Sequence, residues 1–212
     1  MLRPTCLRLL SMRATDPTRN HMRPFLAVAV LTLAIGIPRA TPGQTSPVQP
    51  PAACREAALP DSISQALKAN FAGWRPLRVS DLDGDDPKIW LQEHPKECPG
   101  IATGHFENPD SVSYTFLLVP LEQRGGVGPW QIVVLGSGSS AAPFAWKRLE
   151  RCAGKDCFAP VIYRKPPGKY VGFDDTKSVH LKLDGIGVEF IQKSSYIYYW
   201  SEGRYHKIDT SD

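Results

Sequence analysis

Apolar residues at four-residue spacing mark the first predicted element of the chain. They are Ile63, Leu67 and Phe71. This period places the three side chains on one face, so we expect an amphipathic helix over residues 61–72. Further along, Asp86 stands directly before Pro87, and an N-cap residue type followed by proline is typical of a helix start. A short second helix is therefore predicted from this point.

From residue 100 onward the pattern changes to short apolar runs of strand length. These runs predict strands at residues 113–120, 130–136, 144–149 and 160–164, and an earlier run predicts a strand at residues 75–80. These strands follow one another without helices between them, which favours antiparallel pairing.

Two hairpins are predicted nearer the C-terminus. Apolar and polar residues alternate over 179–183 and 186–190, on either side of the Asp-Gly pair at 184–185. Asp-Gly between alternating runs favours a tight two-residue turn, so these two segments are expected to pair. A second hairpin is expected to join residues 195–200 to residues 204–208.

The predicted fold class is α+β. One N-terminal amphipathic helix and a short second helix would pack on a mainly antiparallel sheet of hairpins. Residues 59–212 would form this single domain. Residues 45–58 are rich in proline and small polar residues, which is typical of an extended linker.

Residues 1–44 have the pattern of a secretory signal peptide. A basic approach precedes the apolar run from Phe25 to Ile37, and this run is shorter than the roughly 20 residues that span a bilayer. Met22 is an alternative start that would give a leader of ordinary length, and a retained membrane anchor is the alternative interpretation. We expect a periplasmic or secreted protein with no membrane span after signal removal.

The charge of the chain changes once this leader is set aside. The formal net charge is +4, but residues 1–44 contribute six Arg and one Asp, and the remainder is close to neutral. A near-neutral domain gives no electrostatic reason to expect a nucleic-acid partner.

The cysteines favour disulfides. Cys6 lies in the leader, and the remaining four are Cys54, Cys98, Cys152 and Cys157. An even number in an exported protein favours two bridges, and three pairings are possible. The polar, turn-forming segment between Cys152 and Cys157 favours a local bridge, which leaves Cys54 for Cys98. Zinc is the alternative, but it would need a second closely spaced Cys or His pair.

The acidic turn at residues 81–86 is a weak candidate for a metal site. Asp81, Asp83 and Asp85 alternate, as carboxylate ligands of calcium do, but the glycine and glutamate positions of a calcium-binding loop do not match. Capping of the following helix explains the same residues.

Motifs for catalysis or cofactor binding are weak. The G-x-G-x-x-A pattern at residues 136–141 is expected to be a flexible loop, because Pro143 and Trp146 interrupt any helix after it. No nucleophile elbow or zinc-protease motif occurs, and we expect no cofactor and assign no catalytic residue. Four histidines beyond the leader are isolated in sequence: His94, His105, His180 and His206.

The most aromatic stretch is a candidate recognition surface. Alternation places Tyr196, Tyr198 and Trp200 on one face of a strand, with Tyr205 across the turn. Exposed Tyr and Trp side chains bind sugar rings or peptides, because they combine apolar area with a polar tip. Packing of this face against the core is the alternative.

Several segments resemble a group of small exported bacterial proteins of unassigned function. They are residues 71–74 (Phe-Ala-Gly-Trp), 80–83, 98–106, 182–186 and 199–203. The helix end at 71–74 is also similar to that of periplasmic PepSY-like domains. Both resemblances imply export and a single domain, and neither implies a catalytic residue.

Two functions are compatible with the sequence. The first is an exported, non-catalytic binding or inhibitory domain for an unidentified protein, peptide or glycan. The second is a small secreted hydrolase whose residues converge only in space. A histidine in a concave site with a serine and a carboxylate would favour the hydrolase.

Overall fold

Two helices and eleven strands make up the regular structure of the described chain. The computed structural model describes Cys54, residues 59–139 and residues 142–211. The helices are α1 (Asp61–Asn70) and α2 (Asp86–Glu93), and a 3-10 turn, η3 (Val79–Asp81), precedes α2. The strands are β1 (Trp74–Pro76), β2 (Ile101–Gly104), β3 (Ser113–Pro120), β4 (Trp130–Ser139), β5 (Ala142–Cys152), β6 (Val161–Lys165), β7 (Gly168–Val171), β8 (Ser178–Leu181), β9 (Gly185–Phe190), β10 (Ser194–Ser201) and β11 (Arg204–Ser211).

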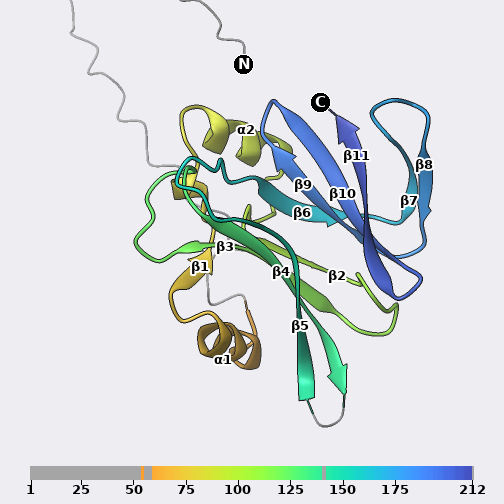
Figure 1. Cartoon of the computed structure of the whole chain (residues 1–212), viewed down its shortest axis with the longest axis horizontal. Helices are drawn as coiled ribbons and strands as arrows, with labels where there is room; N and C mark the ends of the chain where they lie inside the picture. Colours follow the sequence, from red (N-terminus) through yellow and green to blue (C-terminus); the bar gives the residue numbers. More distant parts are fainter. Residues whose placement is uncertain (1–53, 55–58, 140–141, 212) are drawn as a thin grey trace, which may run out of the picture. The chain divides into compact units, whose positions relative to one another are not determined.

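The strands form two sheets and a separate ribbon, and all of their pairings are antiparallel. The first sheet has the order β1-β3-β4-β5, and β2 also pairs with β3. The second sheet has the order β11-β10-β9-β6, and β7 pairs with β8 as a two-stranded ribbon (Figure 1). The α+β class with mainly antiparallel pairing is confirmed, although the strands divide into separate sheets.

Three apolar clusters hold these layers together. The helix α1 packs Ile63 and Leu67 against the first sheet, where Phe116 and Leu118 of β3 lie. On the opposite face of β3, Leu117 and the neighbouring strands pack against the second sheet. A smaller cluster joins the β7–β8 ribbon to β10 and β11. Because β3 is covered on both faces, its sequence is a continuous apolar run rather than an alternating one.

Both predicted helices are present, and the first is shorter than predicted. The first ends at Asn70, and Phe71 caps it through a backbone hydrogen bond to Leu67. The second begins at Asp86, so its N-cap is Asp85 and not Asp86 as predicted. The strand predicted at 75–80 is reduced to β1, because the chain turns into η3 to place Asp81 beside β1.

The hairpin predicted around residues 184–185 is wrong. Strand β8 pairs with β7, and β9 pairs with β6 and β10. Asp184 instead joins the loop after β2: its Oδ2 accepts the backbone N–H of His105 at 2.8 Å, and its own N–H donates to the His105 carbonyl at 3.2 Å. A buried carboxylate with these partners holds the crossing from the ribbon to the second sheet.

The last predicted hairpin and the cysteine pairing are confirmed. Strands β10 and β11 pair down to Ser201 and Arg204, so the turn is Glu202-Gly203, and both of its residues have positive φ, at 51° and 75°. This is the geometry that suits the twist of a hairpin. The structure bonds Cys54 to Cys98 and Cys152 to Cys157, with Cα atoms 4.9 and 6.1 Å apart.

The predicted leader at 1–44 lies outside the described residues, as does all of the predicted linker at 45–58 except Cys54. Within the part of the chain that the structure describes, no helix is long and apolar enough to cross a membrane.

Candidate functional site

An aromatic stripe runs along β10 and faces the first sheet; it consists of Tyr196, Tyr198 and Trp200. Tyr196 is only 5% exposed and belongs to the core between the sheets. Its hydroxyl donates a hydrogen bond to Oε2 of Glu150 at 2.6 Å, and the Tyr198 hydroxyl donates to the same oxygen at 2.9 Å. Burial raises the pKa of both tyrosines, and the hydrogen bonds and charge of Glu150 raise it further. We call these three residues the Glu150 cluster.

The other two residues of the predicted surface lie beside the ion pair that Lys147 forms with Glu107. Trp200 and Tyr205 are half-buried, and their rings are 5.0 Å apart in an edge-to-face arrangement. Lys147 Nζ lies 4.3 Å from the centroid of the Trp200 ring and donates to Oε2 of Glu107 at 2.7 Å. Burial raises the pKa of Tyr205, and the nearby Glu107 raises it further.

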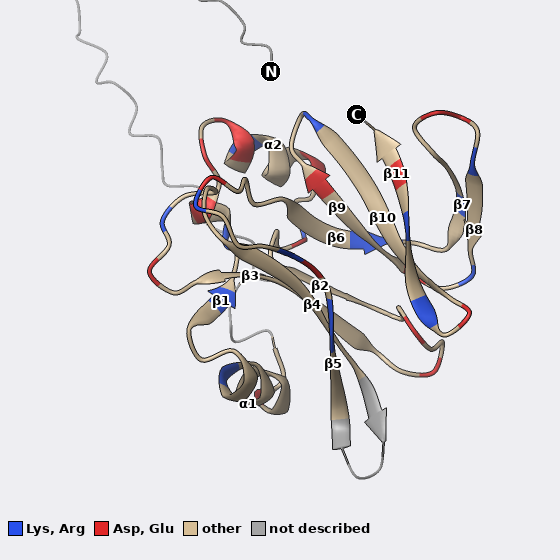
Figure 2. Cartoon of the chain, in the orientation of Figure 1, with Lys and Arg blue, Asp and Glu red and all other residues tan. Residues whose placement is uncertain are grey.

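Most of the aromatic stripe therefore connects the two sheets. The stripe packs on charged side chains of β5, which Figure 2 shows with basic and acidic residues along its length, and on Glu107. The hydroxyls of Tyr196 and Tyr198 are satisfied by Glu150, which gives these two tyrosines a structural role. The Tyr205 hydroxyl is buried and has no hydrogen-bond partner among the described residues.

The three aspartates of the acidic turn have different surroundings and do not converge on one point. Both carboxylate oxygens of Asp81 accept hydrogen bonds from the Arg75 guanidinium. Asp83 Oδ2 accepts the backbone N–H of Gly126 at 3.0 Å, and Asp85 caps α2 without a side-chain hydrogen bond. These three carboxylates do not form one of the metal-compatible groups found among the described residues. The G-x-G-x-x-A segment also differs from its prediction, since residues 136–139 extend strand β4.

The described histidines lie in separate places. His206 is hydrogen-bonded to the Ser201 carbonyl, and His180 is exposed on β8. The backbone N–H of His105 donates a hydrogen bond to Asp184, and Nδ1 of the His105 ring is buried without a hydrogen-bond partner. His94 is hydrogen-bonded to Glu97. None of these four is hydrogen-bonded to a serine hydroxyl in the described structure, so no triad geometry supports the hydrolase.

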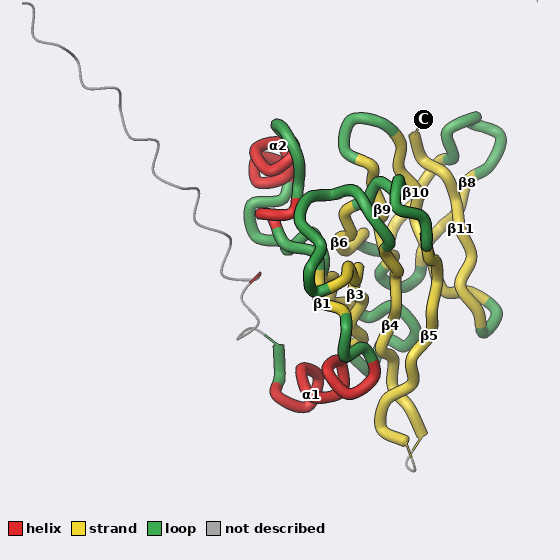
Figure 3. Tube along the Cα trace, turned by 60° about the vertical axis from the view of Figure 1, so that its left-hand side comes forward, coloured by secondary structure: helices red, strands yellow, loops and turns green. Residues whose placement is uncertain are grey.

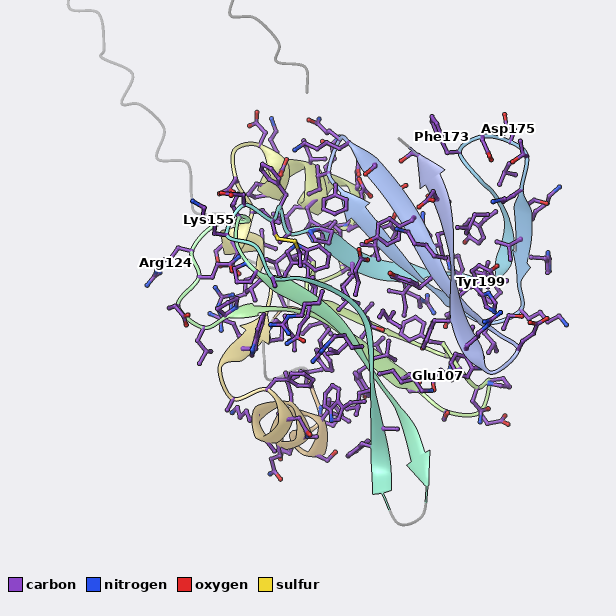
Figure 4. The ribbon with its side chains drawn as sticks, viewed as in Figure 1. Glu107, Arg124, Lys155, Phe173, Asp175 and Tyr199 are labelled. Carbon is purple, nitrogen blue, oxygen red and sulfur yellow. A yellow bond between two sulfur atoms is a disulfide. The ribbon has the colours of Figure 1, made fainter. Side chains whose placement is uncertain are left out.

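The hollow between the β7–β8 ribbon and the β10–β11 hairpin has about 390 Å³ of free volume. Its lining residues include Phe173, Asp174, Lys177, Val179, Tyr199 and Ile208. Figure 4 shows Phe173 at the loop that joins β7 to β8, and Tyr199 where the ribbon passes the hairpin. The lining combines two aromatic rings with side chains of both charges. We call it the Phe173 hollow.

Hydrogen bonds hold the loop that forms one wall of this hollow. The Phe173 N–H donates to the Asp209 carbonyl of β11 at 2.9 Å, and the Gly172 N–H donates to the Lys177 carbonyl at 2.8 Å. Asp174 accepts the Thr176 hydroxyl and backbone N–H, and these bonds lower the pKa of Asp174. The loop is thus anchored to the edge strand, and it presents the Phe173 ring with 58% of its surface exposed.

Two other hollows have more apolar linings. One, of about 500 Å³, lies between η3 and α2 and reaches Cys54; the other, of about 250 Å³, lies between α1 and β1 and reaches Leu59. In the sequence, Cys54 and Leu59 directly flank residues 55–58, which lie outside the described part of the chain. We therefore derive no ligand site from them.

A cluster of possible metal ligands lies at the far end of α2. Donor atoms of Glu93, His94 and Glu189 all lie within 4.8 Å of one another. The sequence did not predict this group, because Glu189 is 95 residues away from His94 along the chain. Only the spacing of Glu93, His94 and Glu97 near a helix end could have indicated part of it.

Comparisons of the chain with protein-family models, with curated proteins and with solved structures found no match. The resemblance to PepSY-like domains accordingly stays a prediction, and the function has to be argued from the geometry.

Proposed function

We propose that this protein is an exported, non-catalytic binding domain and that the Phe173 hollow receives its ligand. The observation that carries this proposal is the exposed Phe173 ring, held by backbone hydrogen bonds at the mouth of a hollow that also contains Tyr199. Ligand sites combine apolar and aromatic walls with a few polar groups that orient the ligand.

The chemistry of the lining suits a peptide or glycan segment. Aromatic rings bind the apolar face of a sugar or side chain, while the exposed Lys177 side chain is available to bind a polar or acidic group. Residues preorganised before binding lose less conformational entropy when the ligand arrives, which favours affinity. The bonded Gly172–Lys177 loop meets that condition.

A binding test can use two equally exposed phenylalanines. Phe158 is 57% exposed and lies outside the Phe173 hollow, so Phe158→Ala removes a comparable ring and is the matched control for Phe173→Ala. Labelled wild-type protein is applied to glycan and peptide arrays, and each retained ligand is then measured by titration. We expect Phe173→Ala to weaken binding roughly tenfold or more, as loss of a hot-spot aromatic does, and Phe158→Ala to bind as the wild type does.

Three outcomes would contradict the proposal. They are absence of binding by the wild type on both arrays, equal affinities of the two alanine variants, and chemical turnover of a retained ligand. Circular dichroism of both variants verifies that neither change has altered the fold.

Export is tested on the chain made in a bacterium. Intact-mass measurement should show loss of about the first 40 residues, as expected for signal-peptide cleavage. Thiol titration should find Cys54, Cys98, Cys152 and Cys157 without free thiols. Full-length protein with free thiols in the cytoplasm would contradict export.

A further inference from the structure

The end of α2 and the end of β9 bring three acidic side chains around one histidine. Glu93 is the last residue of the helix and His94 follows it, while Glu189 lies on β9. Figure 3 shows the helix α2 and the strand β9 that carry them. Glu97 follows on the next turn of the chain and joins the same group through His94. None of these residues lines the Phe173 hollow, so this inference does not depend on the proposed function.

The histidine ring is held in one orientation. Nδ1 of His94 lies 3.0 Å from Oε2 of Glu97. The ring stacks on Trp90, with centroids 4.3 Å apart and planes inclined by 20°, and its other neighbour is Tyr163 at 4.4 Å. A carboxylate on one ring nitrogen fixes the tautomer and raises the basicity of the other nitrogen, which is the arrangement of metal-binding histidines. Nε2 is the donor that remains.

The carboxylates differ in how they are oriented. The Tyr163 hydroxyl donates to Oε2 of Glu189 at 3.3 Å, so that side chain has a positioning partner. The Glu93 carboxylate is exposed, and no hydrogen bond or ion pair engages it within the described residues. Burial raises the pKa of Tyr163, and the nearby charges of Glu189, Glu97 and Glu93 raise it further.

This concentration of negative charge lacks a matching cation. Neither Glu93 nor Glu189 forms an ion pair with a lysine or arginine in the described part of the chain. Lys165 is near, but its Nζ lies over the Tyr163 ring, 4.8 Å from the centroid. The C-terminal end of α2 adds the negative end of the helix dipole. A bound cation would relieve this repulsion.

We infer that Glu93, His94 and Glu189 bind one divalent transition-metal ion, with Glu97 and Tyr163 as positioning residues. One imidazole and two carboxylates suit Zn²⁺ and Mn²⁺, and a water would complete the coordination. Two donors on one such ion are at most about 4.4 Å apart, given metal–ligand distances near 2.0–2.2 Å. The donor atoms now lie within 4.8 Å of one another, so small side-chain movements would bring them into this range, and Glu93 is the exposed member of the group.

The test is a metal titration of the untagged full-length chain after treatment with a chelator. Zn²⁺ and Mn²⁺ are titrated against a competing chromophoric chelator. Wild-type protein should bind one equivalent of at least one of these ions. Glu93→Gln should weaken that binding roughly tenfold or more, and Glu97→Gln should weaken it by about 10- to 100-fold, the usual range for a partner of a metal-binding histidine.

Matched controls separate this site from adventitious binding. Glu122→Gln changes an exposed glutamate elsewhere, and His180→Gln changes an exposed histidine, so both should bind metal as the wild type does. X-ray absorption of the Zn²⁺ complex should show one imidazole and otherwise oxygen ligands. The described Glu93 side chain has no partner to lose, and its replacement removes one of the repelling charges. Glu93→Gln should therefore keep or raise the wild-type melting temperature without metal.

The inference is overturned by any of three results. The wild type binds neither ion, Glu93→Gln and His94→Gln bind with wild-type affinity, or the absorption spectrum shows sulfur or more than one imidazole.

Discussion

The Tyr196 hydroxyl and the Glu150 carboxylate are joined by a hydrogen bond of 2.6 Å, although the two residues are 46 positions apart in the chain. Tyr198 donates to the same oxygen. The pair links β10 of the second sheet to β5, which is an edge strand of the first. The sequence predicts this aromatic stripe as a recognition surface, but most of it packs between the two sheets of the domain.

Removal of the Glu150 carboxylate should destabilise the domain. Glu150→Ala leaves two tyrosine hydroxyls without their acceptor, and we expect a loss of about 2–4 kcal/mol in the free energy of unfolding, because unsatisfied buried polar groups retain their desolvation cost. Urea denaturation measures this loss. Adding Tyr196→Phe and Tyr198→Phe to Glu150→Ala should recover part of it, since the orphaned hydroxyls are gone. Glu122→Ala, at an exposed position, is the control. A Glu150→Ala variant as stable as that control would contradict the structural role.

The buried tyrosines should resist ionisation. Burial is the first cause of a raised pKa for Tyr163, Tyr196, Tyr198 and Tyr205. Since their pKa is higher in the folded state than the unperturbed value of about 10, their contribution to stability is complete below that pH and is lost as the pH rises through the raised values. Near-ultraviolet absorbance should show these tyrosines ionising together with alkaline unfolding. Ionisation of all seven tyrosines near pH 10 with the fold intact would refute this expectation.

Gly185 lies where the chain crosses from β8 to β9, and its surroundings leave no room for a side chain. A Cβ on Gly185 would lie 2.6 Å from Leu181 Cδ2 and 2.8 Å from Ile197 Cγ2. Gly185→Ala should therefore destabilise the domain by about 1–3 kcal/mol through overpacking. Gly73→Ala is the matched control, because no atom lies within 4 Å of the added carbon. Thermal melting of both variants gives the comparison, and equal melting temperatures would argue for a solvent-exposed turn at Gly185.

The two disulfides should differ in their effect on stability. The bonded cysteines Cys54 and Cys98 are 44 residues apart, whereas Cys152 and Cys157 are separated by 5. In the chain-entropy model, the long loop contributes about 4 kcal/mol and the short one about 2 kcal/mol. The Cys54→Ser/Cys98→Ser variant should melt at a lower temperature than Cys152→Ser/Cys157→Ser. Recovery of a peptide linking Cys98 to Cys152 under non-reducing conditions would disprove the pairing itself.

Local patterns in the sequence determined much of the fold. Ile63 and Leu67 at helical spacing predicted α1, and the strand-like segments 195–200 and 204–208 on either side of a short connection predicted the β10–β11 hairpin. The short spacing of Cys152 and Cys157 predicted a local bridge, and the other pair followed. Each of these features depends on the backbone preferences or side chains of residues within a few positions of one another, so the information lies in one stretch of chain.

Tertiary structure alone decided the rest. Asp184-Gly185 has the composition of a hairpin turn, yet burial of the Asp184 carboxylate against the His105 backbone outweighs that local preference. The aromatic stripe faces inward because β5 supplies Glu150 as its acceptor, and Glu189 reaches His94 because β9 and α2 end beside each other. Such contacts join segments that are far apart in sequence. Their free energy comes from burial and hydrogen bonding between the assembled sheets. The local pattern of apolar and polar residues carries no information about these long-range contacts.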